Sequence, residues 1–208
     1  QVLSADFAPQ NAPIGYWSRQ YAYDKASIIS HVHAFTEGMK AAKVLTTSKH
    51  FPGLGAVIGN TDISAGVRDD QTNSNSESVQ IFKDLISSGT PSIMTATAIY
   101  DKIDPNLPGA FSSKMVDGLL RKQLGFDGLV ITDDLSNAVQ VQSWTPGQRA
   151  VLALSAGNDL VLANEPTQIP EMISEVLQKA KADPDFAKKI SQSATRVIKV
   201  KEEMKLVE

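Results

Sequence analysis

Residues 128–137 read Gly-Leu-Val-Ile-Thr-Asp-Asp-Leu-Ser-Asn, and this stretch decides the fold. The β-branched run at 130–132 predicts a buried strand that ends in two neighbouring carboxylates, Asp133 and Asp134. Because side chains alternate along a strand, at most one of the two can face the mouth of a site. The carboxyl end of such a strand is where α/β barrels place their catalytic groups, although an aspartate there also suits the cap of a following helix.

A second stretch shows the same pattern of a short strand followed by polar side chains. Residues 44–55 read Val-Leu-Thr-Thr-Ser-Lys-His-Phe-Pro-Gly-Leu-Gly, which predicts a short strand over 44–48 followed by Lys49 and His50. Lys and His side by side at a strand mouth suit hydrogen bonding to a polyhydroxylated or anionic ligand. Taken alone, such a pair more often marks the start of a solvated loop.

The rest of the chain alternates apolar strand-like runs with amphipathic helical patterns, which favours parallel βαβ units. Five strands are predicted, one that ends near Ala8-Pro9 and four at 44–48, 92–99, 128–132 and 159–162. Helices are predicted after the Asp24 cap and at 76–87, 112–123, 147–155, 168–182 and 185–207. A long loop over 53–75 separates two of these units, and loops of that length are usually functional or disordered.

The helix after Asp24 is predicted to bury one apolar face. Its members are Ile28, Ile29, Val32, Phe35 and Met39. Two of the three histidines of the chain, His31 and His33, fall on different faces of this helix, which indicates structural or solvated positions rather than a site.

The amino-acid composition excludes several kinds of partner and binding site. The 208 residues carry 20 basic and 23 acidic side chains and no cysteine. This balance gives no reason to expect nucleic acid as a partner, and the lack of cysteine excludes disulfides and thiolate metal sites. No apolar run approaches the roughly 18 residues of a membrane span, and no signal peptide is recognised at residue 1. Cytoplasmic and secreted locations are both compatible with the sequence.

Together the two stretches resemble the N-terminal barrel domain of glycoside hydrolase family 3, and within it the NagZ-type β-N-acetylhexosaminidase branch. Residues 49–55 are similar to the family's K-H-F-P-G-H-G, and residues 124–136 to its L-G-F-x-G-v-i-x-[ST]-D-D-L-[SN]. Further pieces follow in the family's order: residues 14–15 and 19–24 are similar to I-G-x-R-S-F-G-x-D-P, and residues 156–159 to A-G-x-D.

The resemblance implies an α/β fold of the TIM type and a retaining glycoside hydrolase that needs no metal or organic cofactor. It implies that Asp133 is the nucleophile and that Asp134 points away and holds the loop by hydrogen bonds. Arg19, Lys49 and His50 match positions that bind sugar hydroxyls in the family.

This chain lacks the residues that supply the general acid in the NagZ branch. The NagZ branch supplies an Asp-x-His dyad from the loop after K-H-F-P-G-H-G, whereas this loop offers Ser64 and Gly66, and Leu54 replaces the motif's second histidine. Asp62 is the one carboxylate at the loop's centre, and it is a weak acid candidate that is also typical of a turn residue. Thr97 stands where many relatives have a histidine.

Five predicted strands fall short of the eight of a complete barrel. We therefore expect residues 1–208 to form a single, partial barrel domain that lacks the first strands of the family. Because a partial barrel exposes strand edges, we also expect an upstream half-barrel segment or an oligomer partner to cover them.

Three functions are compatible with these residues. The first is a retaining glycoside hydrolase acting on β-N-acetylhexosaminides or related β-glycosides. The second is a catalytically impaired homologue or fragment that serves as a glycan- or protein-binding domain. The third, a phosphate-binding barrel that uses residues 53–59, is weak because that loop lacks a P-loop pattern.

Overall fold

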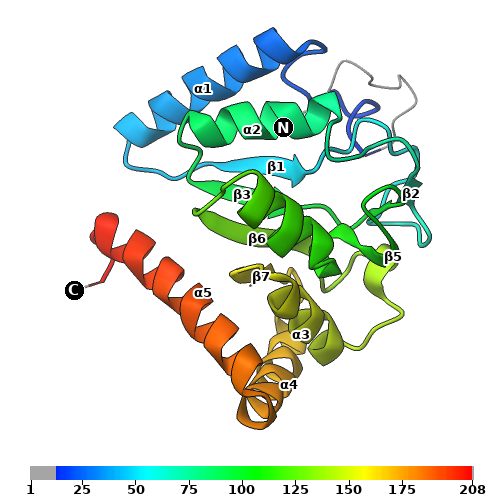
Figure 1. Cartoon of the computed structure of the whole chain (residues 1–208), viewed down its shortest axis with the longest axis vertical. Helices are drawn as coiled ribbons and strands as arrows, with labels where there is room; N and C mark the ends of the chain where they lie inside the picture. The colour runs from blue at the N-terminus through cyan, green and yellow to red at the C-terminus, as the bar shows by residue number, and fades with distance from the viewer. Residues whose placement is uncertain (1–12, 208) are drawn as a thin grey trace.

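The computed structural model describes residues 13–207, and its main sheet has four parallel strands (Figure 1). The strands are β1 (Thr47–Phe51), β3 (Ser92–Thr95), β6 (Leu129–Asp134) and β7 (Leu160–Leu162). Each strand pairs with the next one along the chain, so spatial order equals chain order. A doubly wound sheet reverses its order midway, whereas a (β/α) barrel does not. The predicted partial barrel of the TIM type is therefore confirmed.

Helices alternate with the strands of this sheet: one precedes β1, one lies in each connection between consecutive strands, and two follow β7. They are α1 (Lys25–Ala41), α2 (Glu77–Ser87), α3 (Pro146–Ala156), α4 (Ile169–Ala182) and α5 (Pro184–Glu203), with a π-helix, η2 (Lys114–Gln123), and short 3-10 turns η1 (Gly109–Phe111), η3 (Val139–Val141) and η4 (Pro166–Gln168). Asp24 caps α1 as predicted, because its carboxylate accepts a hydrogen bond of 2.9 Å from the backbone N–H of Ser27.

The strand register decides which side chains share a face. Lys49 pairs with Met94, and Met94 pairs with Ile131, so these three side chains lie on the inner face of the sheet. Ile93 and Val130 lie on the outer face and are fully buried in the main core. The helical residues packed in the same core include Val79, Phe82 and Leu85 of α2 and Met115, Leu119 and Leu120 of η2. Burial of each such side chain stabilises the fold by about 1.5–3 kcal/mol.

A second, three-stranded sheet follows the carboxyl ends of β1 and β3. It consists of β2 (Arg68–Asp69), β4 (Ile99–Tyr100) and β5 (Asp104–Pro108) in the order β2-β4-β5. The sequence did not predict it, because two of its strands are only two residues long and show no alternation.

Two predicted strands differ from the structure. The strand predicted over 44–48 begins at Thr47 and continues through Lys49 and His50, because residues 42–46 first complete the turn that leaves α1. Within that turn Lys43 has a φ of +58°. The strand predicted over 92–99 ends at Thr95, and β4 is a separate strand in the second sheet. The strand predicted to end near Ala8-Pro9 lies outside the described residues.

The predicted apolar face of α1 is only partly buried. Ile28 and Val32 belong to the core, but the prediction for Phe35 is wrong because its side chain is 50% exposed. The Phe35 ring instead lies 6.2 Å from the ring of Tyr21 in the preceding loop. His31 and His33 are exposed. Across residues 13–207, no helix is both long and apolar enough to span a bilayer.

Candidate active site

The two carboxylates at the end of β6 face opposite sides of the sheet. The pairing of β6 with β7 is irregular between Ile131 and Asp134. The contacts of Asp133 therefore show its direction: its Oδ2 lies 3.5 Å from Nε2 of His50, next to Lys49 on β1. Asp134 is directed to the outer side and is buried. Of the two neighbours, only Asp133 is positioned to meet a ligand at the barrel mouth.

The Asp133 carboxylate is held by few contacts. Its side chain is 22% exposed, and its Oδ1 accepts a hydrogen bond of 2.9 Å from the backbone N–H of Asp134. Burial raises the pKa of Asp133, and the negative charge of Asp62 raises it further. The hydrogen bond from Asp134 and the charges of Lys49 and Arg19 lower the pKa, but the net direction is upward. The upward shift means that burial disfavours the charged form of Asp133, and perturbed carboxylates of this kind are typical of functional sites.

His50 lies beside this carboxylate. Its Nε2 is 3.5 Å from Oδ2 of Asp133, and the Lys49–His50 and Phe51–Pro52 peptide bonds are cis. Burial lowers the pKa of His50 well below its usual value, and the positive charges of Lys49 and Arg19 lower it further. The imidazole is therefore neutral near pH 7, and its contact with Asp133 is not an ion pair. Among the described residues, the buried Nδ1 of His50 has no hydrogen-bond partner, which leaves it for a ligand.

Two cations approach the same point from other segments. Lys49 lies on β1, one strand removed from β6, which corresponds to a strand separation of about 10 Å. Arg19 comes from the loop before α1, where its Nη1 donates a hydrogen bond of 2.7 Å to the carbonyl oxygen of Pro13. The charges of both residues act on Asp133 and on His50. The structure thus brings together the residues singled out in three distant motifs, while their roles stay predictions.

Asp134 has a structural role, as predicted. Its carboxylate accepts hydrogen bonds from the backbone N–H and the hydroxyl of Ser136, at 3.0 and 2.6 Å, and from the backbone N–H groups of Asn137 and Asn164. Burial alone would raise the pKa of Asp134, but these hydrogen bonds outweigh it and the pKa is lowered. The carboxylate therefore ties the loop after β6 to the segment after β7.

Asp62 is exposed, but its loop is fixed against the loop that follows β6. The backbone N–H of Val139 donates to the carbonyl of Asp62 at 3.2 Å, and that of Gln140 donates to the carbonyl of Thr61 at 3.0 Å. The Gln140 side chain also exchanges two hydrogen bonds with the backbone of Val67. Because the charge of Asp62 raises the pKa of Asp133, the two carboxylates share one electrostatic environment.

Sequence reasoning missed two residues that shape the site. Gln140 is one of them, and no local signal marks a glutamine that binds a backbone 73 residues away. Tyr100 is the other: it is fully buried, and its hydroxyl donates to the carbonyl of Gly53 at 2.7 Å. Burial raises the pKa of Tyr100 well above its usual value, and the charges of Asp69 and Asp133 add to the effect.

Among the described residues, the buried hydroxyl of Thr97 has no hydrogen-bond partner.

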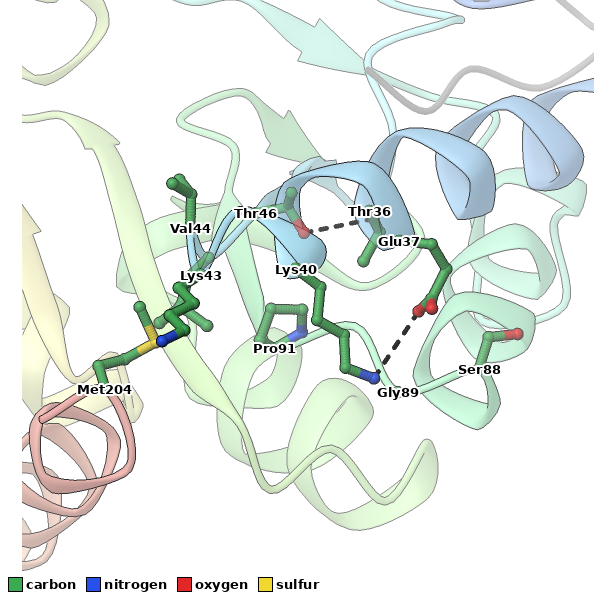
Figure 2. Close-up of a pocket in the computed structure, with 11 residues that line it drawn as sticks. Thr36, Glu37, Lys40, Lys43, Val44, Thr46, Ser88, Gly89, Pro91 and Met204 are labelled. Atoms are coloured by element: carbon green, nitrogen blue, oxygen red, sulfur yellow. Dashed lines mark hydrogen bonds and ion pairs between the residues drawn. The ribbon is translucent and has the colours of Figure 1, made fainter.

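A separate cavity of about 210 Å³ lies at the opposite end of the sheet, before the amino ends of β1 and β3 (Figure 2). It is bounded by Lys40 of α1, Val44, Pro91 and Met204, and the Lys40 ammonium lies 3.8 Å from the Glu37 carboxylate. None of the residues gathered at the Asp133 end lines it. Within residues 13–207, no three His, Asp or Glu side chains are grouped as a metal site would need.

The chain and its fold match known proteins. Residues 4–200 match the model of the glycosyl hydrolase family 3 N-terminal domain. The chain belongs to this family.

Named relatives agree with this assignment. A beta-hexosaminidase of Methylobacillus flagellatus is 33% identical over 84% of this chain and 50% of its own length, and one of Vibrio cholerae is 35% identical over 70% and 43%. The crystal structure of a beta-N-acetylhexosaminidase from Beutenbergia cavernae is 47% identical, with a TM-score of 0.92, over 96% of this chain and 61% of that one. This chain thus spans about half the length of these curated relatives.

Proposed function

We propose that this chain carries the nucleophile and part of the sugar site of a retaining glycoside hydrolase acting on β-N-acetylhexosaminides. The observation that carries the proposal is the placement of Asp133 on the inner face of β6, 3.5 Å from a neutral His50 and within the field of Lys49 and Arg19. The names of the relatives, which are beta-hexosaminidases, support the substrate class.

In the first step an Asp133 carboxylate oxygen attacks the anomeric carbon. The bond from that carbon to the glycosidic oxygen breaks, and the leaving oxygen takes a proton from an acid. The Asp62 carboxyl, which acts electrostatically on Asp133, is the acid that we propose. In the second step water attacks the anomeric carbon, its proton returns to the Asp62 carboxylate, and the Asp133 carboxylate is released.

The polar donors around Asp133 suit the substrate in this scheme. Arg19 and Lys49 donate hydrogen bonds to sugar hydroxyls and favour the ionised form of Asp133. His50 offers a buried ring nitrogen that a hydroxyl can satisfy. Each of these interactions requires the sugar ring to lie over the inner face of β6.

We also propose that further strands cover the sheet edges. Within the described residues, the outer edges of β1 and β7 pair with no strand, and unpaired edges favour association. An upstream half-barrel segment of a longer chain, or an oligomer partner, would cover them. Sedimentation of the 208-residue chain separates these cases, because only the oligomer model predicts a single oligomer of defined size, whereas edges left open by a missing segment associate without a fixed size.

The proposed reaction is tested with two β-N-acetylglucosaminides that differ in leaving group. An activated aryl glycoside needs little protonation, whereas a natural disaccharide needs an acid. A weak acid at Asp62 predicts turnover of both, with a large excess for the aryl glycoside. Binding of both without turnover would favour the glycan-binding alternative, and no interaction with either would contradict the proposed substrate class.

A further inference from the structure

The loop that carries Arg19 also projects two aromatic rings into solvent. The backbone N–H of Ser18 donates to the carbonyl of Gly15 at 3.0 Å, and that of Arg19 donates to the carbonyl of Ile14 at 3.1 Å. Ile14 is fully buried in the core. The turn is therefore fixed at its base, with Tyr16 and Trp17 at its tip.

These two rings are unusually open to solvent. Tyr16 is 75% exposed and Trp17 is 65% exposed, and their rings meet edge to face with centroids 5.0 Å apart. The other aromatic side chains of the loop have visible structural contacts. The Tyr21 ring packs on His31 and Phe35, and the Tyr23 hydroxyl accepts a hydrogen bond of 2.6 Å from Gln20.

The tip also differs from the motif that residues 14–24 resemble. That motif, I-G-x-R, has one residue between the glycine and the arginine, whereas this chain has three, Tyr16, Trp17 and Ser18. Measured against the motif, the segment is longer by two residues, and it contains both aromatic rings. A longer loop of ordinary polar residues would need no explanation, but an exposed aromatic pair has a solvation cost that a ligand would relieve.

The tip lies close to the sugar site. Trp17 is two residues from Arg19, so their Cα atoms are at most about 7 Å apart. The Arg19 charge acts on both Asp133 and His50. A ligand that fills the space over Asp133 and extends past Arg19 therefore comes within reach of Trp17.

We propose that Tyr16 and Trp17 form a stacking surface for a second sugar ring of a β-linked N-acetylhexosamine oligosaccharide whose first ring lies over Asp133. The proposal rests on the proposed function. A β-hexosamine ring with equatorial substituents presents a face of axial C–H groups, which pack on the negative face of an aromatic ring. Two rings set edge to face offer one flat face and one lateral wall, which suits a ring joined to a longer chain.

The test measures affinity as a function of ligand length by titration calorimetry. The ligands are sulfur-linked N-acetylglucosamine oligomers of two to four rings, which resist hydrolysis, and the methyl β-glycoside of one ring. In the 208-residue chain, Trp17→Ala should weaken the tetrasaccharide about tenfold, the effect of an aromatic contact of about 1.4 kcal/mol. The loss should be much smaller for the single ring. Phe35→Ala removes a comparably exposed ring on α1 and is the matched control.

Tryptophan emission locates the contact. Trp17 is one of two tryptophans, and the other, Trp144, packs edge to face on Phe111 with centroids 5.3 Å apart. The tetrasaccharide should shift the emission to the blue, and Trp17→Phe should remove the shift. A Trp17 emission already blue-shifted without ligand would show that protein covers the tip, and would overturn the proposal.

The outcomes separate this proposal from the proposed function. If the unmodified chain binds the tetrasaccharide and Trp17→Ala binds it equally well, the stacking surface is refuted and the function stands. If the unmodified chain binds no ligand of any length, the proposed function fails, and the stacking surface fails with it.

Discussion

The inner and outer sides of β6 end in chemically identical carboxylates with opposite environments. Asp134, on the outer side, accepts four hydrogen bonds from three residues, and its pKa is lowered. Asp133, on the inner side, accepts one backbone hydrogen bond and lies beside a neutral imidazole, and its pKa is raised. Both residues are aspartates, so it is the direction of each side chain at the end of the strand that makes Asp133 the candidate reactive group and Asp134 a structural one.

The two pKa directions have opposite consequences for stability. A raised pKa means that the ionised form of Asp133 is less favourable in the fold than in the unfolded chain, so this group lowers stability as pH rises through its folded pKa. A lowered pKa means that Asp134 contributes stability above its unfolded pKa, and that this contribution is lost as pH falls through its folded pKa.

Replacement of the inner carboxylate should have the largest effect. Asp133→Asn removes the proposed nucleophile, and we expect turnover of an aryl β-N-acetylglucosaminide to fall by at least about 10³-fold. The free energy of unfolding near pH 7 should stay the same or rise, because a poorly compensated buried charge is removed. Steady-state kinetics and urea unfolding check both parts. Turnover within tenfold of the unmodified chain would remove Asp133 from the mechanism.

Asp62→Asn should have the next largest effect. If Asp62 is the acid, hydrolysis of a natural glycan falls by about 10²–10⁴-fold, and the aryl glycoside loses far less. Because the Asp62 charge raises the pKa of Asp133, the acidic limb of the pH–rate profile should also move to lower pH. Asp70→Asn, an exposed carboxylate of the same loop, is the matched control. Equal losses on both substrates would show that Asp62 is not the proton donor.

Replacement of the outer carboxylate should affect stability more than chemistry. Asp134→Asn converts an acceptor of four hydrogen bonds into a group with one acceptor oxygen, which should cost about 1–3 kcal/mol of unfolding free energy near neutral pH. The difference from the unmodified chain should shrink as pH falls through the lowered pKa of Asp134. Urea unfolding at several pH values measures this difference. Asp127, two residues before the same strand, has a side chain that is 96% exposed, so Asp127→Asn should change little.

Local periodicity in the sequence was enough to predict the difference between Asp133 and Asp134. Alternation along 128–134 predicted that the two carboxylates face opposite sides, and the hydrogen bonds of Asp134 confirm its predicted structural role. The order of strands and helices followed from alternating apolar patterns. The convergence of residues from distant motifs followed from the rule that parallel strands end at one edge.

Other features depend on contacts between distant segments, which no local pattern encodes. The Gln140 side chain, for example, hydrogen-bonds the backbone of Val67, which lies 73 residues away in the loop of Asp62. The second sheet forms from short strands that are defined only by their partners. The exposure of Phe35 depends on what packs over α1, which periodicity alone does not define.

Covalent labelling tests the central claim most directly. A mechanism-based fluorosugar traps the glycosyl-enzyme, and peptide mapping by mass spectrometry then locates the modified residue. The account predicts a single label on Asp133, because only the inner carboxylate can reach the anomeric carbon of a sugar bound at the barrel mouth. A label on Asp134, or robust turnover with no label on either residue, would contradict it.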